Sequence, residues 1–331
     1  MNPIANVNAR DVKDAVDSLV RVRKQGRQVS VTGGGTDLLG MMKERLVRPD
    51  VLVNLKTIRG LSGIAADASG VKIGALTTLA TLGRDPVITT RYPLLAEAAN
   101  SVGTPQIRNL ATLGGNICQR PWCWYFRNAF PCYKNGGNRC FAPTGENQLH
   151  AIFGGGPSYI VHPSDTAPAL VALDARIRIA GPAGERIVPA ADFFALPKLN
   201  PARENVLADD EVVAEILIPP PAPSSRSTYR KLLDREAWTH AVVSAAVTLQ
   251  MEGAICRDAR IVLGGVAPIP WDRPRAAEVL RGKRLSPEVA AEAARIAVED
   301  ARPMTKNAYK VALTSALIRR TLVSLAENGN G

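Results

Sequence analysis

Ala111-Thr112-Leu113-Gly114-Gly115-Asn116 opens the stretch that decides the fold, and His162-Pro163-Ser164-Asp165 closes it. Between these segments runs a loop that holds four of the five cysteines and ends in Gly154-Gly155-Gly156. Glycine pairs let the backbone turn sharply and approach a ligand closely, because no Cβ stands in the way. The stretch therefore predicts two glycine-dependent turns that bracket a cysteine-rich loop.

The cysteines of this loop are spaced for a metal centre. Cys118, Cys123, Cys132 and Cys140 are separated by four, eight and seven residues, and Gly136-Gly137 allows the chain to wrap around a cluster. Thiolates are the usual ligands of iron–sulfur clusters, so a cluster is the favoured interpretation. Structural zinc is an alternative, although no Cys-x-x-Cys pair is present, and free or disulfide-bonded thiols are another.

The remaining cysteine and two of the histidines are expected to be structural. Cys256 lies in a strand pattern and is predicted to be a buried core residue. His162 and His240 have no metal-ligand spacing to each other, so satisfied structural histidines are the simpler interpretation.

A second glycine run lies near the N-terminus. A predicted strand, Gln28 to Val31, leads into Thr32-Gly33-Gly34-Gly35-Thr36-Asp37-Leu38, and an apolar helix is predicted from Leu38 to about Leu46. Backbone N–H groups in such a turn, followed by a helix N-terminus, favour an anion. The pattern is neither a P-loop nor a Gly-x-Gly-x-x-Gly fingerprint, and a tight structural turn is the alternative. Two such glycine turns could hold the two ends of one extended dinucleotide.

Composition sets the class of protein. The chain has 331 residues, 46% of them hydrophobic, which is enough for two or three domains with real cores. The net charge of +11 comes from scattered Lys and Arg without basic runs, so no nucleic-acid partner is expected. No apolar run is long enough for a membrane helix, and Met1 to Arg10 lacks the pattern of an export signal. A cytoplasmic protein is expected; export to the periplasm on the signal of a partner is the alternative.

The rest of the chain mixes helix and strand patterns. Predicted before the cysteine loop are a helix from Val12 to Val20 with Asn8 as a possible cap, a strand at Val51 to Leu55, a hairpin over 63–75, a cap at Thr77 or Thr78, and a helix from Tyr92 to Val102. Pro219 to Ser225 reads as a linker. After it come paired strands at Val242 to Met251 and Ile255 to Leu263, and helices around Arg275 to Leu280, Pro287 to Glu299 and Ala308 to Ala326.

Several of these motifs together resemble a known family. Gly34-Gly35-Thr36-Asp37-Leu38, Ile107-Arg108-Asn109, Thr112-Leu113-Gly114-Gly115-Asn116 and Pro163-Ser164-Asp165 occur in order. Tyr229-Arg230-Lys231 and Gly264-Gly265-Val266-Ala267 extend the pattern towards the C-terminus. The chain resembles, over nearly its whole length, the FAD-binding subunit of the molybdenum hydroxylases, which include xanthine dehydrogenase and carbon monoxide dehydrogenase.

The resemblance implies an α+β fold with two domains. An FAD-binding domain of two α/β pieces, of the vanillyl-alcohol oxidase type, would span residues 1–220, with the cysteine-rich insert at about 117–156. A smaller C-terminal domain of antiparallel strands and helices, like that of the carbon monoxide dehydrogenase flavoprotein, would span residues 226–329.

The resemblance also implies roles for individual residues. The loop made of Thr32, Gly33, Gly34, Gly35, Thr36, Asp37 and Leu38 would hold the FAD pyrophosphate, and Thr112, Gly114, Gly115 and Asn116 would lie on the flavin or ribityl side. Asp165 would accept hydrogen bonds from the cofactor, and Lys231 would lie near the isoalloxazine. The alternatives are a helix cap for Asp165 and a solvated surface lysine for Lys231.

The cysteine-rich insert departs from most of the family. It is similar to the insert of the 4-hydroxybenzoyl-CoA reductase flavin subunit and of bacterial aldehyde oxidoreductases, which implies a 4Fe-4S cluster. Cys123, Cys132 and Cys140 would be ligands. Cys118 is the candidate for the fourth, and His150 is the reserve, because the segment where the insert returns has no cysteine.

The implied function is electron transfer. In such an enzyme a large molybdopterin subunit oxidises an aldehyde or N-heterocycle, and a small 2Fe-2S subunit passes electrons to FAD and on to an external acceptor. This chain would be the flavin subunit. A self-contained flavin oxidase of the vanillyl-alcohol type and a zinc or iron–sulfur sensor are the competing interpretations.

Overall fold

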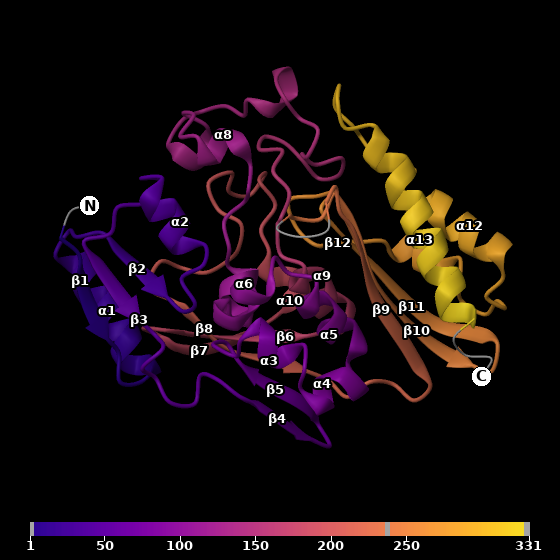
Figure 1. Cartoon of the computed structure of the whole chain (residues 1–331), viewed down its shortest axis with the longest axis horizontal. Helices are drawn as coiled ribbons and strands as arrows, with labels where there is room; N and C mark the ends of the chain where they lie inside the picture. Colours follow the sequence, from indigo (N-terminus) through magenta and orange to yellow (C-terminus); the bar gives the residue numbers. More distant parts are fainter. Residues whose placement is uncertain (1–2, 236–238, 328–331) are drawn as a thin grey trace.

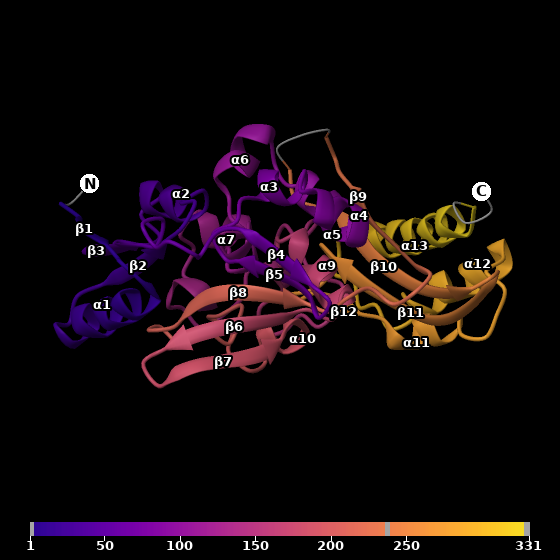
Figure 2. The same cartoon turned by 90° about the horizontal axis from the view of Figure 1, so that it is seen from below.

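The computed structural model describes residues 3–235 and 239–327 and has three parts in a row, each with its own sheet (Figures 1 and 2). The N-terminal part contains a parallel sheet in the order β1-β3-β2. Its elements are β1 (Ala5–Asn8), α1 (Val12–Lys24), β2 (Val29–Thr32), α2 (Leu38–Lys43) and β3 (Val51–Asn54). Alternating Val and Leu on β3 bury one face, which packs with Leu19 and Val16 of α1.

The predicted cap of α1 is wrong. Asn8 is the last residue of β1, a short strand that the sequence patterns did not indicate. Asp11 is the N-cap instead, and its side chain accepts a hydrogen bond from the Asp14 N–H. The helical pattern gave the position of the helix but not its first residue, because an Asn and an Asp three positions apart are both good caps.

The middle part is built on an antiparallel sheet in the order β4-β5-β8-β6-β7. Its elements are β4 (Ile64–Asp67), β5 (Gly70–Gly74), α3 (Leu79–Leu82), α4 (Pro86–Arg91), α5 (Pro93–Asn100), α6 (Pro105–Leu110), α7 (Leu113–Ile117), α9 (Thr166–Ala172), β6 (Arg176–Gly181), β7 (Gly184–Pro189), α10 (Ala190–Phe193) and β8 (Val212–Ile218). The predicted hairpin is β4-β5, and Thr78 rather than Thr77 caps α3 by accepting the Thr81 N–H at 3.1 Å.

The C-terminal part is an antiparallel sheet in the order β12-β11-β10-β9 with helices against it (Figure 1). Its elements are β9 (Ser225–Leu232), β10 (Val243–Glu252), β11 (Ile255–Gly264), β12 (Trp271–Asp272), α11 (Pro274–Glu278), α12 (Pro287–Ile296) and α13 (Tyr309–Glu327). The predicted strand pair and three helices are confirmed. Ser225, assigned to the linker, is the first residue of β9.

The middle and C-terminal parts share a core. Tyr229, Ala246 and Val262 of the C-terminal sheet belong to the same buried cluster as α5, α9 and the middle sheet. Apolar side chains buried across this boundary contribute about 25 cal/mol per Å² each, so the two parts are held in a fixed arrangement. Sites formed by both parts are therefore built on rigid elements.

The insert carries three short helical segments and projects from the middle part (Figure 1). They are α8 (Trp124–Arg127), η1 (Tyr133–Asn135) and η2 (Ala142–Thr144). Phe126 and Cys132 form a separate small core with Met41 of α2. The insert is thus packed against the N-terminal part near the first glycine run.

Candidate functional site

The two glycine turns lie against each other. A Cβ on Gly34 would stand 2.0 Å from the carbonyl oxygen of Leu110, and one on Gly33 would stand 3.3 Å from Thr112 Oγ1. Gly35 has φ +76°, a left-handed conformation that favours glycine. The first turn therefore needs glycine at position 34, where the backbone of Leu110 leaves no room for a side chain, and at position 35, where φ is positive.

The second turn is fixed by hydrogen bonds of its own. Thr112 caps α7, with its hydroxyl accepting the Gly115 N–H at 3.2 Å. The Gly114 N–H donates to the Ala75 carbonyl at 2.8 Å, and a Cβ on Gly114 would stand 2.9 Å from that of Ala75. Glycine is therefore required here for close packing on the middle sheet.

Asn116 joins the second turn to the segment that closes the insert. Its side-chain oxygen accepts hydrogen bonds from the hydroxyls of Ser164 and Thr166, both at 2.6 Å. All three side chains are buried. Asn116 and Ser164 are 48 residues apart in the sequence, so these hydrogen bonds hold the two ends of the insert together.

Asp37, at the start of α2, binds the insert. Its carboxylate pairs with Arg127 Nη2 at 2.7 Å and accepts the Arg120 N–H at 2.9 Å. The Arg127 side chain is only 6% exposed, and its Nε donates to the Pro121 carbonyl. The insert and the first glycine run are therefore connected by a partly buried ion pair, which the sequence patterns did not indicate.

A second ion-pair group anchors the insert. Lys134 pairs with Glu204, which also pairs with Arg120 at 2.7 Å. Burial lowers the pKa of Lys134, and Glu204 opposes that shift. Because a buried cation is costly without a partner, this pair fixes the insert against the 200–204 segment of the middle part.

Asp165 and Lys231 form a buried pair between the middle and C-terminal parts. Lys231 Nζ lies 2.7 Å from Asp165 Oδ2, and each side chain is 4% exposed. The Tyr229 hydroxyl donates to Asp165 Oδ1 at 2.6 Å, and burial with the neighbouring carboxylate raises the pKa of Tyr229 well above its usual range. Asp165 makes no capping bond to α9, and Lys231 is not a surface lysine. The structure contradicts both alternative interpretations of these residues.

Of the two histidines predicted to be structural, His162 is buried and His240 is partly buried. His162 accepts the Ser164 N–H at Nδ1, 3.3 Å away, and its ring packs edge-on against Phe194. Burial lowers the pKa of His240, whose ring lies 5.2 Å from that of Trp122. Trp122 is 47% exposed, and the Arg127 guanidinium lies over its ring, 4.5 Å from the ring centre.

We expect His162 to make the protein sensitive to acid. Burial, and then the Lys134 charge, lower its pKa from 6.5 to about 3. Between these two pH values the unfolded chain binds a proton at His162 that the folded chain does not bind. The free energy of unfolding therefore falls as the pH drops below about 6.5 and levels off near 3. Between pH 6.5 and 4 the loss is about 3 kcal/mol. In His162→Asn the Oδ1 atom can replace Nδ1 as the acceptor, so the free energy of unfolding, measured by urea denaturation, should change less between about pH 6.5 and 4 than in the wild type. The same pH dependence in the variant and the wild type would contradict the prediction.

Two of the four loop cysteines lie in one small core. Cys123 and Cys132 share the small core of the insert, and burial raises the pKa of Cys123 to about 11, with the charges of Cys140 and Cys132 adding to the shift. His150 Nε2 lies 3.3 Å from Cys123 Sγ. The reserve ligand of the sequence interpretation therefore lies beside the thiols.

Cys118 and Cys256 lie elsewhere. Cys118 packs against the large core of the middle part, and burial raises its pKa to about 12. Cys256 is fully buried in the C-terminal core, as predicted. All five cysteines are free thiols. Within residues 3–235 and 239–327, no three His, Cys, Asp or Glu side chains are grouped closely enough to hold a metal ion as they stand.

Lys310 is a buried residue that sequence patterns missed. Its side chain, fully buried near the start of α13, donates to the carbonyls of Gly265 at 2.7 Å, Leu149 at 3.0 Å and His150 at 3.3 Å. Burial lowers its pKa to about 7. This lysine ties the end of the insert to the C-terminal part; the only signal in the sequence is a lysine on the apolar face of a helix.

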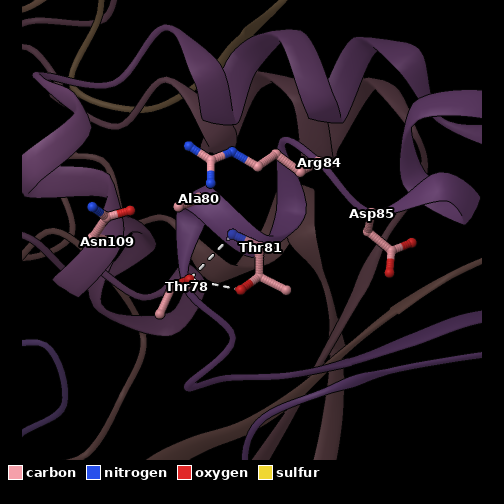
Figure 3. Close-up of a pocket in the computed structure, with 6 residues that line it drawn as sticks. All are labelled: Thr78, Ala80, Thr81, Arg84, Asp85 and Asn109. Carbon is pink, nitrogen blue, oxygen red and sulfur yellow. Dashed lines mark hydrogen bonds between the residues drawn. The ribbon is translucent and has the colours of Figure 1, made fainter.

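A surface cavity of about 380 Å³ opens beside the second glycine turn (Figure 3). Thr78, which forms a β-bridge with Thr112, and Asn109 both line it. The other lining residues are Ala80, Thr81, Arg84 and Asp85. Asp85 is committed to capping α4, where it accepts the N–H groups of Val87 and Ile88.

Comparisons with known proteins agree with this architecture. A family model described as the FAD binding domain in molybdopterin dehydrogenase matches residues 6–221, and one described as the CO dehydrogenase flavoprotein C-terminal domain matches residues 227–325. The chain therefore belongs to the FAD-binding family of the molybdopterin dehydrogenases, whose members are oxidoreductase subunits. The predicted family resemblance and α+β fold class are confirmed.

Individual relatives are similar over most of their length. The aldehyde oxidoreductase FAD-binding subunit PaoB of Escherichia coli is 36% identical over 243 residues, 72% of this chain and 74% of that protein. The carbon monoxide dehydrogenase medium chain of Hydrogenophaga pseudoflava is 30% identical over 315 residues, 94% of this chain and 93% of that one. A solved structure of carbon monoxide dehydrogenase from the same organism matches with a TM-score of 0.77, 27% identity and 98% of each chain covered. In the part of this chain that the structure describes, no helix is long and apolar enough to cross a membrane.

Proposed function

We propose that the chain is the FAD- and iron–sulfur-containing electron-transfer subunit of a molybdenum hydroxylase complex. Its partners would be a large molybdopterin subunit that oxidises an aldehyde or N-heterocycle and a small 2Fe-2S subunit, with electrons leaving to an external acceptor. The observation that supports it most is the contact between the two glycine turns, Gly34 against Leu110, in a chain of this family.

The two turns fit an FAD. Gly33, Gly34 and Gly35 offer backbone N–H groups without side chains, which suits a pyrophosphate, and Gly114 and Gly115 with Thr112 would face the flavin or ribityl side. Bound FAD would supply the exchange between two-electron and one-electron steps. The surrounding residues would position the flavin and set the electrostatic environment around it.

Three other predicted cofactor residues have partners within the chain. Asp37 pairs with Arg127, Asn116 with Ser164 and Thr166, and Asp165 with Lys231. We propose that they shape the FAD site rather than contact the cofactor, because the carboxylates of Asp37 and Asp165 would repel its phosphates and the Asn116 oxygen already accepts two hydrogen bonds. Thr36, Leu38 and the Lys231 ammonium remain proposed contacts of the cofactor.

The thiols of Cys123, Cys132 and Cys140 fit a 4Fe-4S cluster in donor type. The cysteine loop is connected to the first glycine run through Arg127 and Asp37, so a cluster held there would lie near the flavin. Such a cluster would serve as a one-electron relay beside a two-electron cofactor. A single zinc ion held by the same thiols is the second candidate.

The cysteine series tests the cluster. Cys123→Ser, Cys132→Ser and Cys140→Ser should each strip a thiolate and bleach the iron–sulfur absorption, whereas Cys256→Ser should not, because Cys256 lies in the C-terminal core. Iron, zinc and acid-labile sulfide are measured on protein purified without oxygen. About four irons in the wild type are expected; zinc without iron would favour the second candidate.

Assembly tests the role as a subunit. The chain should copurify with a large and a small chain, and it should not oxidise aldehydes alone because the proposal assigns the molybdopterin to the large partner. Aldehyde oxidation by the isolated FAD-loaded chain would contradict the proposal and favour a self-contained oxidase. A chain that binds neither flavin nor iron would favour a sensor.

A further inference from the structure

The insert reaches the proposed flavin site through one aromatic side chain, that of Trp122. This residue lies between the second glycine turn and α8, and it is 47% exposed. A large aromatic side chain that is held in place by its neighbours and still half exposed offers a flat apolar surface to a ligand. The following inference rests on the proposed function, because that ligand is the proposed FAD.

One neighbour of Trp122 connects it to the first glycine run. The Arg127 guanidinium lies 4.5 Å from the centre of the Trp122 ring, within the range of a cation–π contact. The same guanidinium pairs with Asp37 at 2.7 Å, and the Arg127 side chain is buried. Asp37 stands in the glycine run itself. The indole is therefore fixed beside the loop that is proposed to hold the pyrophosphate.

The other neighbour connects Trp122 to the proposed flavin end of the site. The rings of Trp122 and His240 pack with their centres 5.2 Å apart and their planes at 37°. The carbonyl of Thr239, the residue before His240, accepts a hydrogen bond from Lys231 Nζ at 3.4 Å. Lys231 also pairs with Asp165. Through His240, the indole is thus linked to the buried pair that is proposed to lie by the isoalloxazine.

The charges around His240 agree with this position. Burial lowers the pKa of His240; the Asp165 carboxylate opposes that shift, and the charges of Lys231 and Arg127 add to it. Electrostatic effects weaken with distance, so the imidazole lies among these three groups. The neighbour of Trp122 therefore faces both the first glycine run, through Arg127, and the Lys231–Asp165 pair.

The indole suits an isoalloxazine ring. Tryptophan is flat and electron-rich, and it packs on other aromatic rings in offset or edge-on arrangements. Contacts with Arg127 and His240 already restrict its rotation, so little conformational entropy would be lost on contact with a ligand. An FAD extended from the first glycine run to Lys231 would pass the indole, because Trp122 is linked to both ends of that path.

We propose that Trp122 is a flavin-binding residue whose indole packs on the isoalloxazine and shields it. The insert would then complete the flavin site and restrict the access of electron acceptors to the ring. This contact has an optical consequence. An indole that touches an excited flavin donates one electron to it and takes that electron back, which quenches the flavin fluorescence.

The test compares FAD-loaded wild type, Trp122→Phe, Trp122→Ala and Trp124→Phe. Trp124 is the matched control, because it lies in the same insert but packs near His150, with ring centres 5.9 Å apart. Trp122→Phe should bind FAD as the wild type does but with brighter, longer-lived flavin fluorescence. Trp122→Ala should also be brighter and should lose affinity about three- to tenfold, the usual worth of an aromatic pair. Trp124→Phe should match the wild type in both properties.

Iodide, which quenches exposed flavin by collision, tests the shielding. It should quench the flavin of Trp122→Ala more strongly than that of Trp122→Phe, because phenylalanine still covers the ring. Equal iodide quenching in these two variants would show that the side chain does not shield the flavin. If both variants keep the fluorescence and affinity of the wild type, Trp122 does not contact the cofactor. A wild type that binds no FAD would instead refute the proposed function itself.

Discussion

Gly34→Ala is expected to lower the affinity for FAD by at least about thirtyfold, equivalent to about 2 kcal/mol, within the range of overpacking costs. The added Cβ would stand 2.0 Å from the Leu110 carbonyl oxygen and 2.8 Å from its carbon. Both are backbone atoms, so no side-chain rotation relieves the clash. The two glycine turns must separate, and the cofactor proposed to lie across them loses one of its two contacts.

Gly40→Ala is the matched control. Gly40 lies in α2, a few residues beyond the loop, and a Cβ there meets nothing within 4 Å. Alanine also favours the helix more than glycine does. This variant should bind FAD as the wild type does. Affinity is measured by flavin-fluorescence titration of the apoprotein, with urea unfolding of the apoprotein to separate lost affinity from lost stability. Equal affinity in both variants would refute the pyrophosphate assignment.

Local patterns predicted the elements of the site. Three glycines ahead of a helix start leave few conformations other than a tight turn, and the positive φ of Gly35 follows from that. The alternating residues of β10 and β11 and the Glu252-Gly253 turn gave the C-terminal hairpin. Helix ends were less predictable, because Asn8 and Asp11 are equally good caps until the parallel strand β1 takes one of them.

Contacts between distant segments were not predictable from one sequence. Asp37 was assigned to the cofactor because it stands in the glycine run, yet its partner Arg127 lies 90 residues away in the insert. Lys134 and Glu204 are 70 residues apart. Each alone resembles an ordinary charged residue, and only burial, set by tertiary packing, requires it to be paired.

The buried pair of Lys231 and Asp165 illustrates both points. The sequence placed both residues at the FAD site through the family resemblance, and the structure brings them together across the boundary between the middle and C-terminal parts. Lys231 Nζ also donates to the Ser101 carbonyl, at 3.1 Å. One lysine therefore joins α5, α9 and β9, all of which contribute to the shared core.

Lys231→Met is expected to destabilise the protein by about 3 to 5 kcal/mol, the usual cost of removing one member of a buried ion pair. Methionine has a similar shape, so the loss comes from charge: the Asp165 carboxylate, 4% exposed, keeps only the Tyr229 hydroxyl among the hydrogen-bond partners in the described residues. Unfolding by guanidinium chloride measures the change. The FAD-loaded and apo forms are compared, because loss of the cofactor would otherwise add to the effect.

Two further variants decide whether charge pairing is the cause. Asp174→Asn removes an exposed ion pair with Arg260. The Asp174 side chain is 75% exposed and the Arg260 side chain 36%, and the pair joins the end of α9 to the C-terminal sheet. It should cost less than about 1 kcal/mol. Asp165→Asn combined with Lys231→Met removes both charges, and the double variant should be more stable than the sum of the single changes predicts by about 2 kcal/mol. Strict additivity would show that lost packing, not the unpaired carboxylate, causes the destabilisation.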